Sequence, residues 1–276
     1  MIRIFPLQTG WVKVKRAHQN FRGPEFFRLP SIMTDFRWTP WLPILCWLID
    51  HPEGPILVDT GEHARISEPE FTKQDPVNSW IIRKLLKFDV SLDSNLEMAL
   101  HRIGFKPDQI KHVILTHVHS DHTGGLSSVP KATIWMNSVE HQNALTHPKG
   151  TFPFHWPKSL QIKYPEMSQN DSFFGLSATL TSDSNIRIVN TPGHSEGHQS
   201  VVVTIDDLNY FLAGDVSFTE QQVKTMCIPG ISENFRKVKD TYSQIDRFAC
   251  AHKTVYLPTH DLESLKRFYN KTLYAD

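Results

Sequence analysis

Apolar and polar residues alternate with different periods along this chain, and its first part has the pattern of β-strands. Short apolar runs bounded by turn residues predict strands, because aliphatic and β-branched residues favour extended structure. These runs lie at residues 2–7 and 11–14, with a predicted turn at Thr9 and Gly10, and at residues 44–49 and 56–58, with the polar segment 50–54 as a hairpin turn.

Helical patterns alternate with further strand patterns in the rest of the chain. Residues 94–103 place Leu96, Ala99, Leu100 and Ile103 on one helical face, and Gly104 is a stop signal. This mixed order predicts an α/β or α+β fold with a layered core. Further helices are predicted at residues 138–145, 234–248 and 262–269, and further strands at 112–115, 132–136, 186–189, 200–205, 210–212 and 254–257.

The sequence contains no internal repeat and no Gly/Ser-rich linker, so we expect a single domain over residues 1–276. Two segments, 62–92 and 147–175, are polar, contain prolines and aromatic residues, and have no clear period. Unstructured segments of this length in a compact domain are usually functional. We therefore expect lid or pocket loops near these two segments.

Composition and charge argue against several classes of protein. The chain has 29 Lys plus Arg and 29 Asp plus Glu, and this zero net charge disfavours a general nucleic-acid partner. No apolar run is long enough to cross a bilayer, and the first residues lack the apolar stretch of a signal peptide. Cys46, Cys227 and Cys250 form no disulfide pattern. We expect a cytoplasmic protein without a nucleic-acid or membrane partner.

The fifteen histidines point to chemistry, because several of them cluster. Residues 117–122 have the sequence His-Val-His-Ser-Asp-His and follow the predicted strand 112–115. His117 and His119 are two apart and lie on the same side of an extended segment, and a turn after them would direct Asp121 and His122 to a second point nearby. Imidazole and carboxylate ligands suit Zn²⁺ and similar divalent ions.

Three more ligand-type side chains follow predicted strands. His194 follows Gly193, and Asp215 also follows a glycine. His260 lies two residues after Pro258, just beyond the last predicted strand. If these strand ends meet at one edge, the count of ligands gives two metal sites. His117, His119 and His194 would form one site, Asp121, His122 and His260 the other, and Asp215 would bridge the two ions.

The order of these motifs resembles the metallo-β-lactamase superfamily. The resemblance covers about residues 44–260 and implies a four-layer αββα sandwich with a dinuclear metal site at one edge of the sheets. It also implies supporting roles for Asp59, in the sequence Val58-Asp59-Thr60-Gly61, and for His198. These two residues would orient the metal ligands without binding a metal themselves.

Within the superfamily, the spacing is most similar to the N-acyl homoserine lactonase group and its small-lactone relatives. The similar residues include Asp59-Thr60-Gly61 and the segment 191–200, Thr-Pro-Gly-His-Ser-Glu-Gly-His-Gln-Ser. The lactonases typically have a Tyr that contacts the substrate carbonyl three residues after the bridging Asp. This chain has Phe218 there and lacks that hydroxyl donor.

The leading hypothesis is a dinuclear metal-dependent hydrolase that opens a lactone, and the resemblance implies quorum quenching. Two divalent ions, with Zn²⁺ favoured over Fe or Mn, would hold a bridging hydroxide that attacks the carbonyl carbon. Asp121 is the candidate catalytic residue, which would carry a proton to the leaving group. The alternatives are a glyoxalase II-like thioesterase, a β-lactamase, a phosphodiesterase and, from a different class, a non-catalytic metal-binding module.

Aromatic residues are candidates for a pocket that binds the small-molecule substrate. Their composition would equally suit packing of loops onto the body of the protein, or a homodimer interface. The candidates are Phe26, Phe27, Trp38, Phe152, Phe154, Trp156 and Phe218.

Overall fold

The structure is a computed structural model, which describes residues 1–146 and 149–276. His147 and Pro148, the first two residues of the predicted loop 147–175, lie outside the described residues. The chain forms two compact units. Residues 1–14 and 38–164 form the first unit, and residues 15–37 and 165–276 form the second. The prediction of a single domain remains a prediction.

The first unit contains a mixed sheet of seven strands among its described residues, in the order β4-β1-β2-β3-β5-β6-β7. Strands β3, β5, β6 and β7 are parallel, and β1 pairs antiparallel with both of its neighbours. The elements are β1 (Arg3–Val14), β2 (Leu42–Asp50), β3 (Ile56–Val58), α3 (Pro76–Leu85), β4 (Leu86–Asp89), α4 (Leu96–Arg102), β5 (His112–Ile114), α5 (Ser120–Thr123), β6 (Thr133–Trp135), α6 (Ser138–Thr146) and β7 (Gln161–Lys163), with 3-10 turns at Pro107–Gln109, Leu126–Ser128 and Pro153–His155.

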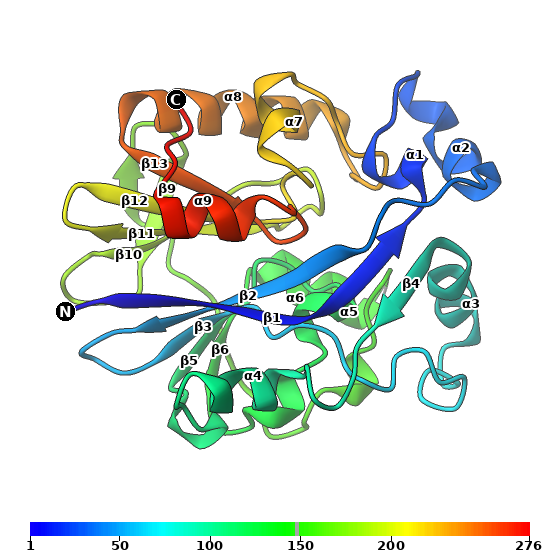
Figure 1. Cartoon of the computed structure of the whole chain (residues 1–276), viewed down its shortest axis with the longest axis horizontal. Helices are drawn as coiled ribbons and strands as arrows, with labels where there is room; N and C mark the ends of the chain where they lie inside the picture. Colours follow the sequence, from blue (N-terminus) through cyan, green and yellow to red (C-terminus); the bar gives the residue numbers. More distant parts are fainter. Residues whose placement is uncertain (147–148) are drawn as a thin grey trace. The chain divides into compact units, whose positions relative to one another are not determined.

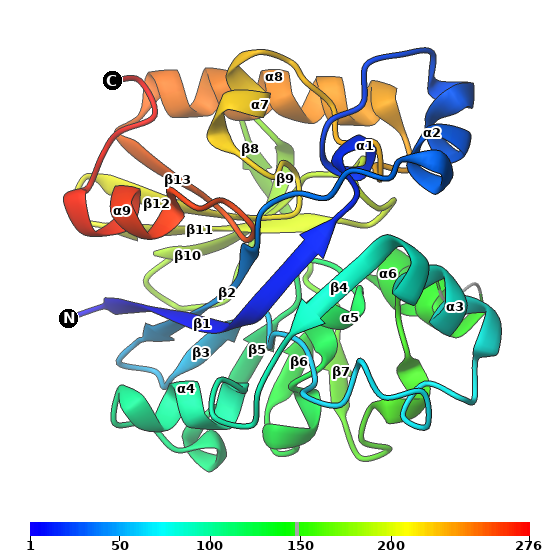
Figure 2. The same cartoon turned by 45° about the vertical axis from the view of Figure 1, so that its right-hand side comes forward.

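Helix α4 covers one face of this sheet, as its apolar period predicts (Figure 2). Leu96 and Leu100 are buried together with Leu48, Leu57 and Val113 of the sheet. Asn95 caps the helix by accepting from the N–H of Met98. This packing holds β3 and β5 rigidly, and the segments that follow both strands carry candidate site residues.

The second unit contains a sheet of six strands in its described part, in the order β13-β12-β11-β10-β9-β8. Helix α8 runs along this sheet (Figure 1) and buries Val238, Tyr242, Ile245 and Phe248 against residues such as Phe211. The elements are α1 (Arg16–Gln19), α2 (Arg28–Thr34), β8 (Gln169–Asp171), β9 (Gly175–Thr179), β10 (Ile186–Asn190), β11 (Gln199–Ile205), β12 (Leu208–Gly214), α7 (Glu220–Lys224), α8 (Phe235–Ala251), β13 (Thr254–Pro258) and α9 (Ser264–Asn270), with a 3-10 turn at Glu25–Phe27.

The mixed α/β class with two sheets is confirmed, but three local predictions were wrong. No turn forms at Thr9 and Gly10, because β1 continues through them and its pairing with β2 shifts by one residue. A Cβ atom on Gly10 would lie 2.6 Å from Val90 Cγ2, so the glycine serves close packing instead of a turn.

The segments 62–92 and 147–175 are also more ordered than predicted, because the first contains α3 and β4 and the second contains β7 and β8. Asp75 caps α3 by accepting from the N–H of Asn78, and Pro76 occupies the first helical position. The helical period was hidden because Val77 and Trp80, both exposed, add apolar residues to its outer face.

No helix in the described residues is both long enough and apolar enough to cross a membrane.

Candidate metal centre

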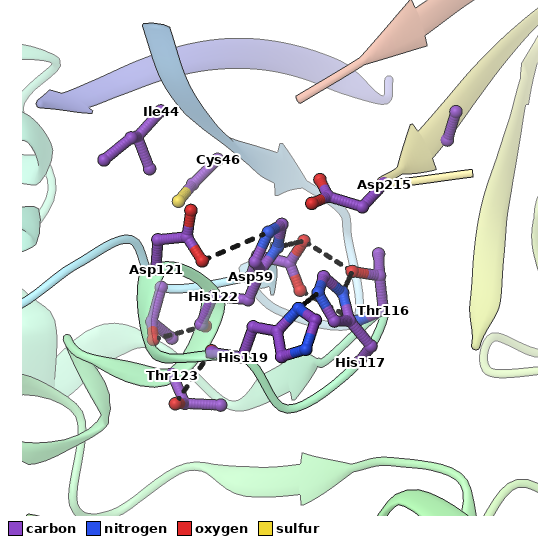
Figure 3. Close-up of polar contacts among 12 residues, drawn as sticks. Ile44, Cys46, Asp59, Thr116, His117, His119, Asp121, His122, Thr123 and Asp215 are labelled. Atoms are coloured by element: carbon purple, nitrogen blue, oxygen red, sulfur yellow. Dashed lines mark hydrogen bonds and ion pairs between the residues drawn. The ribbon is translucent and has the colours of Figure 1, made fainter. Parts of the chain in front are cut away.

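Asp59 is the centre of a buried hydrogen-bond group in the first unit. It directly follows β3, and its backbone has φ of +62°. One carboxylate oxygen accepts from the N–H of Thr116 at 2.8 Å, and the other accepts from Thr116 Oγ1 at 2.9 Å and lies 2.8 Å from His122 Nδ1 (Figure 3). The carboxylate favours a proton on His122 Nδ1, which makes Nε2 the ring nitrogen that can bind a metal.

The segment after β5 brings two imidazoles together. His117 is fully buried, and the extended backbone at His119 starts the short helix α5. His117 Nε2 lies 2.9 Å from His119 Nδ1 (Figure 3), and Thr116 Oγ1 lies 3.1 Å from His117 Nδ1. The two facing nitrogens are therefore directed at one point.

Asp121 and His122 form a second pair in α5. Oδ1 of Asp121 lies 3.9 Å from Nε2 of His122. The carbonyl of His122 accepts from both the N–H and the Oγ1 of Thr60, each at 2.8 Å. These bonds fix α5 to Thr60, the residue next to Asp59. They therefore hold His122 close to the carboxylate that orients its ring.

In the second unit, one carboxylate lies between two histidines. Asp215 follows Gly214 at the end of β12, and its Oδ2 lies 3.7 Å from His194 Nε2. Its Oδ1 lies 3.4 Å from His260 Nε2. The N–H of Thr259 donates to the carbonyl of Gly214 at 3.0 Å and holds the ends of β12 and β13 together. Asp215 thus presents a different oxygen to each histidine.

His198 supports Asp215 through the backbone. Its Nε2 accepts from the N–H of Asp215 at 3.2 Å, and its Nδ1 lies 2.9 Å from Thr191 Oγ1. Thr191 in turn contacts Ser200 Oγ at 2.8 Å. Both ring nitrogens of His198 therefore have protein partners, which suits an orienting residue and not a metal ligand.

The donor atoms in each unit have the chemistry and spacing of metal ligands. Zinc binds histidine nitrogen and carboxylate oxygen at about 2.0–2.2 Å in tetrahedral geometry, so two ligand atoms of one ion lie roughly 3.3 Å apart. The separations are 2.9 Å between His117 and His119, 3.9 Å between Asp121 and His122, 3.7 Å between His194 and Asp215, and 3.4 Å between His260 and Asp215. These pairs fit divalent ions.

Phe218 packs beside one of these candidate ligands and is buried. Its ring stacks on His260, with the centroids 5.6 Å apart and 28° between the planes, and meets His18 edge-on at 6.1 Å. Its N–H donates to Gln222 Oε1 at 2.7 Å. These contacts give Phe218 a packing role next to His260.

The other aromatic pocket candidates differ in exposure. Phe152 and Trp156 line a cavity in the first unit, and Phe154 packs against Phe152 at its edge. The remaining three are Trp38, which lies under Lys87 Nζ at 4.6 Å, and the exposed pair Phe26 and Phe27, whose centroids are 4.3 Å apart.

Sequence reasoning missed Glu62, which lies three residues after Asp59 and is 2% exposed. Its Oε2 accepts from Ser120 Oγ at 2.5 Å, and its Oε1 accepts from the N–H of His63 at 2.7 Å. Burial, followed by the charge of Asp121, raises the pKa of Glu62 to about 8. The sequence feature that could have indicated Glu62 is its position directly after the Asp59-Thr60-Gly61 motif.

Comparison with known proteins gives a family match. Residues 39–252, more than three quarters of the chain, match the sequence profile of the metallo-beta-lactamase superfamily. An N-acyl homoserine lactonase of Bacillus thuringiensis is 23% identical over 226 residues, which cover 82% of this chain and 84% of that protein. The N-acyl homoserine lactonase AttM of Rhizobium radiobacter is 24% identical over 275 residues, which cover 97% and 96% of the two chains.

Solved structures share the fold of this chain. One is an N-acyl homoserine lactone hydrolase with N-hexanoyl-L-homoserine bound at its catalytic metal centre, with a TM-score of 0.76, 21% identity, and coverage of 95% of this chain and 94% of that chain. Another is AidC, a dizinc quorum-quenching lactonase, with a TM-score of 0.67, 16% identity, and coverage of 95% and 88%.

Proposed function

The chain belongs to the metallo-beta-lactamase superfamily, and from this membership we propose that it is a metal-dependent hydrolase that opens lactone rings. The observation that carries the proposal is the paired spacing of imidazole and carboxylate donors in both units. The curated relatives are N-acyl homoserine lactonases that span more than four fifths of this chain, which supports a lactone as the substrate.

The proposed active site combines the donors of both units into one dinuclear centre. His117 and His119 would join His194 around one ion, and Asp121 and His122 would join His260 around the other. Asp215 would bridge, since its two oxygens already face two different histidines. Two ions held in this way would lower the pKa of a water molecule and polarise the lactone carbonyl.

The residues of the chain have separate tasks in this proposal. Asp59 keeps Nε2 of His122 available as a ligand, and His198 holds the backbone of Asp215. Asp121 is the proposed catalytic residue, because a carboxylate beside the reacting ester can carry a proton from the attacking water to the departing alkoxide. The positioning contacts keep these groups in place before the substrate arrives.

The substrate would be a small ester-like ring. Asp215 stands where the superfamily resemblance implies Cys or Ser for a true β-lactamase, which disfavours β-lactams. Phe218 provides no hydroxyl for the lactone carbonyl, so polarisation would depend on the metal site. We also propose zinc as the native metal, a role in quorum quenching, a cytoplasmic location and a homodimeric assembly.

The experiment is a proton-release assay, since opening a lactone yields an acid. Purified zinc-loaded protein is given lactones that differ in ring size and acyl length, with a chromogenic cephalosporin and a glutathione thioester as comparators. We expect kcat/KM to be highest for a lactone. Faster turnover of either comparator than of every lactone would refute the proposal.

A further inference from the structure

A cavity of about 230 Å³ in the first unit is lined by residues of α5 and of the segment that follows Asp59. Ser120 and Thr123, three residues apart on α5, line it, whereas His122 is directed at Asp59. Aromatic rings from two loops complete its walls, among them Phe71 and Trp156. We call this space the side cavity. It shares α5 with the proposed metal ligands but uses another face.

Glu62 is the acidic group of the side cavity. Its two oxygens each accept one hydrogen bond, from Ser120 Oγ and from the N–H of His63. Within residues 1–146 and 149–276, no lysine or arginine forms an ion pair with this carboxyl. A buried carboxyl that lines a cavity can pair with a cation bound in that cavity.

The aromatic wall is suited to the apolar part of a ligand. Phe71 is stacked between His63 and His155, with centroids 4.3 and 3.7 Å away. Burial lowers the pKa of both histidines, so their imidazoles are neutral near pH 7 and do not repel a cation. Arg65, whose guanidinium lies 5.4 Å from the Phe71 ring, is paired with Glu68 at 2.8 Å.

We propose that the side cavity binds a primary alkylammonium group, with Glu62 as its counter-ion and the aromatic rings around its alkyl chain. This ligand fits the lining better than a neutral acyl chain would, because a neutral chain offers no charge to pair with the Glu62 carboxyl. Resting on the proposed function, the group would be the terminus of a substrate whose lactone lies at Asp121 and His122, the proposed metal ligands on α5.

A binding experiment tests the side cavity without reference to catalysis. Calorimetric titration of the zinc-loaded full chain with n-butylammonium chloride is compared with 1-butanol, which has the same alkyl chain and no charge. We expect the ammonium to bind at least ten-fold more tightly. Glu62→Gln keeps the size and the Ser120 contact, and it should remove this preference. Glu70→Gln, which removes an exposed carboxylate that pairs with Lys73 in the same loop, should retain it.

A kinetic experiment tests the link to the substrate. N-(6-aminohexanoyl) homoserine lactone is compared with N-hexanoyl homoserine lactone. We expect kcat/KM to favour the amino compound by about ten-fold in the wild type and in Glu70→Gln, and by less than two-fold in Glu62→Gln.

The outcomes separate the two proposals. Equal binding of ammonium and alcohol by the wild type, or an ammonium preference that survives Glu62→Gln, would overturn the alkylammonium site even if lactones are hydrolysed. Ammonium binding that depends on Glu62 without hydrolysis of any lactone would support the site and overturn the proposed function. Hydrolysis with no preference for the amino compound would overturn the substrate role.

Discussion

Replacing Asp59 by Asn tests whether a residue that contacts no metal sets the metal affinity. Asp59 has a φ of +62°, a conformation that Asn tolerates better than most residues, so the backbone is kept. The amide oxygen can still accept from Thr116, but the amide nitrogen then faces His122 Nδ1. Two donors would oppose each other, and His122 would move its proton to Nε2, the proposed ligand atom.

The size of the effect follows from the contacts that are lost. Partners that orient a ligating histidine usually contribute about 10- to 100-fold to metal affinity, which corresponds to about 1.4–2.7 kcal/mol. Disturbing a buried hydrogen bond to a charged group costs the metal-free protein about 1–3 kcal/mol as well. We therefore expect Asp59→Asn to weaken one of the two ions selectively and to lower the melting temperature of the metal-free form.

Zinc titration against a coloured chelator measures both ions, and thermal unfolding measures the metal-free form. Asp50→Asn is the matched control, because it removes a carboxylate from the end of the neighbouring strand β2, where Asp50 pairs with Arg3 at the surface. If Asp59→Asn retained both zinc affinities of the wild type, the proposal that Asp59 sets the His122 tautomer would be refuted.

Three further predictions concern the same residues. Asp215→Ala should lower the content of both metal ions, because its carboxylate faces two histidines, whereas His260→Ala should mainly lower the content of one. Elemental analysis after dialysis measures both variants. Full metal content in Asp215→Ala would exclude Asp215 as the bridging ligand. Phe218→Tyr should raise kcat/KM for N-acyl homoserine lactones by supplying a hydroxyl donor. The increase should be smaller than the roughly 10²–10³-fold effect of an isolated oxyanion donor. An unchanged or lower kcat/KM would show that the side chain at position 218 does not reach the substrate. Glu62 has a folded-state pKa of about 8 against an ordinary value of 4.5, so between these pH values the folded metal-free protein binds more protons than the unfolded chain. Its free energy of unfolding should therefore fall as the pH rises from about 4.5 to 8. Urea unfolding of Glu62→Gln should show a smaller fall over this range, and the same pH dependence as in the wild type would contradict the raised pKa of Glu62.

Much of the local structure follows from the sequence, because the site residues come directly after buried strands. The runs before His117, His194 and Asp215 contain consecutive aliphatic residues, which predict strands that the structure confirms as β5, β10 and β12. The orienting contacts of His198 were implied only by the resemblance to a family. No sequence period indicates that its ring accepts from the N–H of Asp215, seventeen residues later.

Other features depend on tertiary contacts that a linear pattern does not encode. Gly10 has the sequence signature of a turn but is required where β1 approaches Val90. Glu62 has the sequence signature of a solvated loop residue, yet it is buried against Ser120, 58 positions away. Sequence reasoning assigns charged residues to the surface by default, so a buried acid beside a cavity is found only in three dimensions.

Stepwise zinc loading of metal-free protein, followed by lactone proton release at each step, tests the dinuclear lactonase most directly. We expect activity with N-hexanoyl homoserine lactone to reach its plateau at two zinc ions per chain. Lactone hydrolysis that is as fast in the metal-free protein as in the loaded protein, or no lactone hydrolysis at two bound ions, would contradict it.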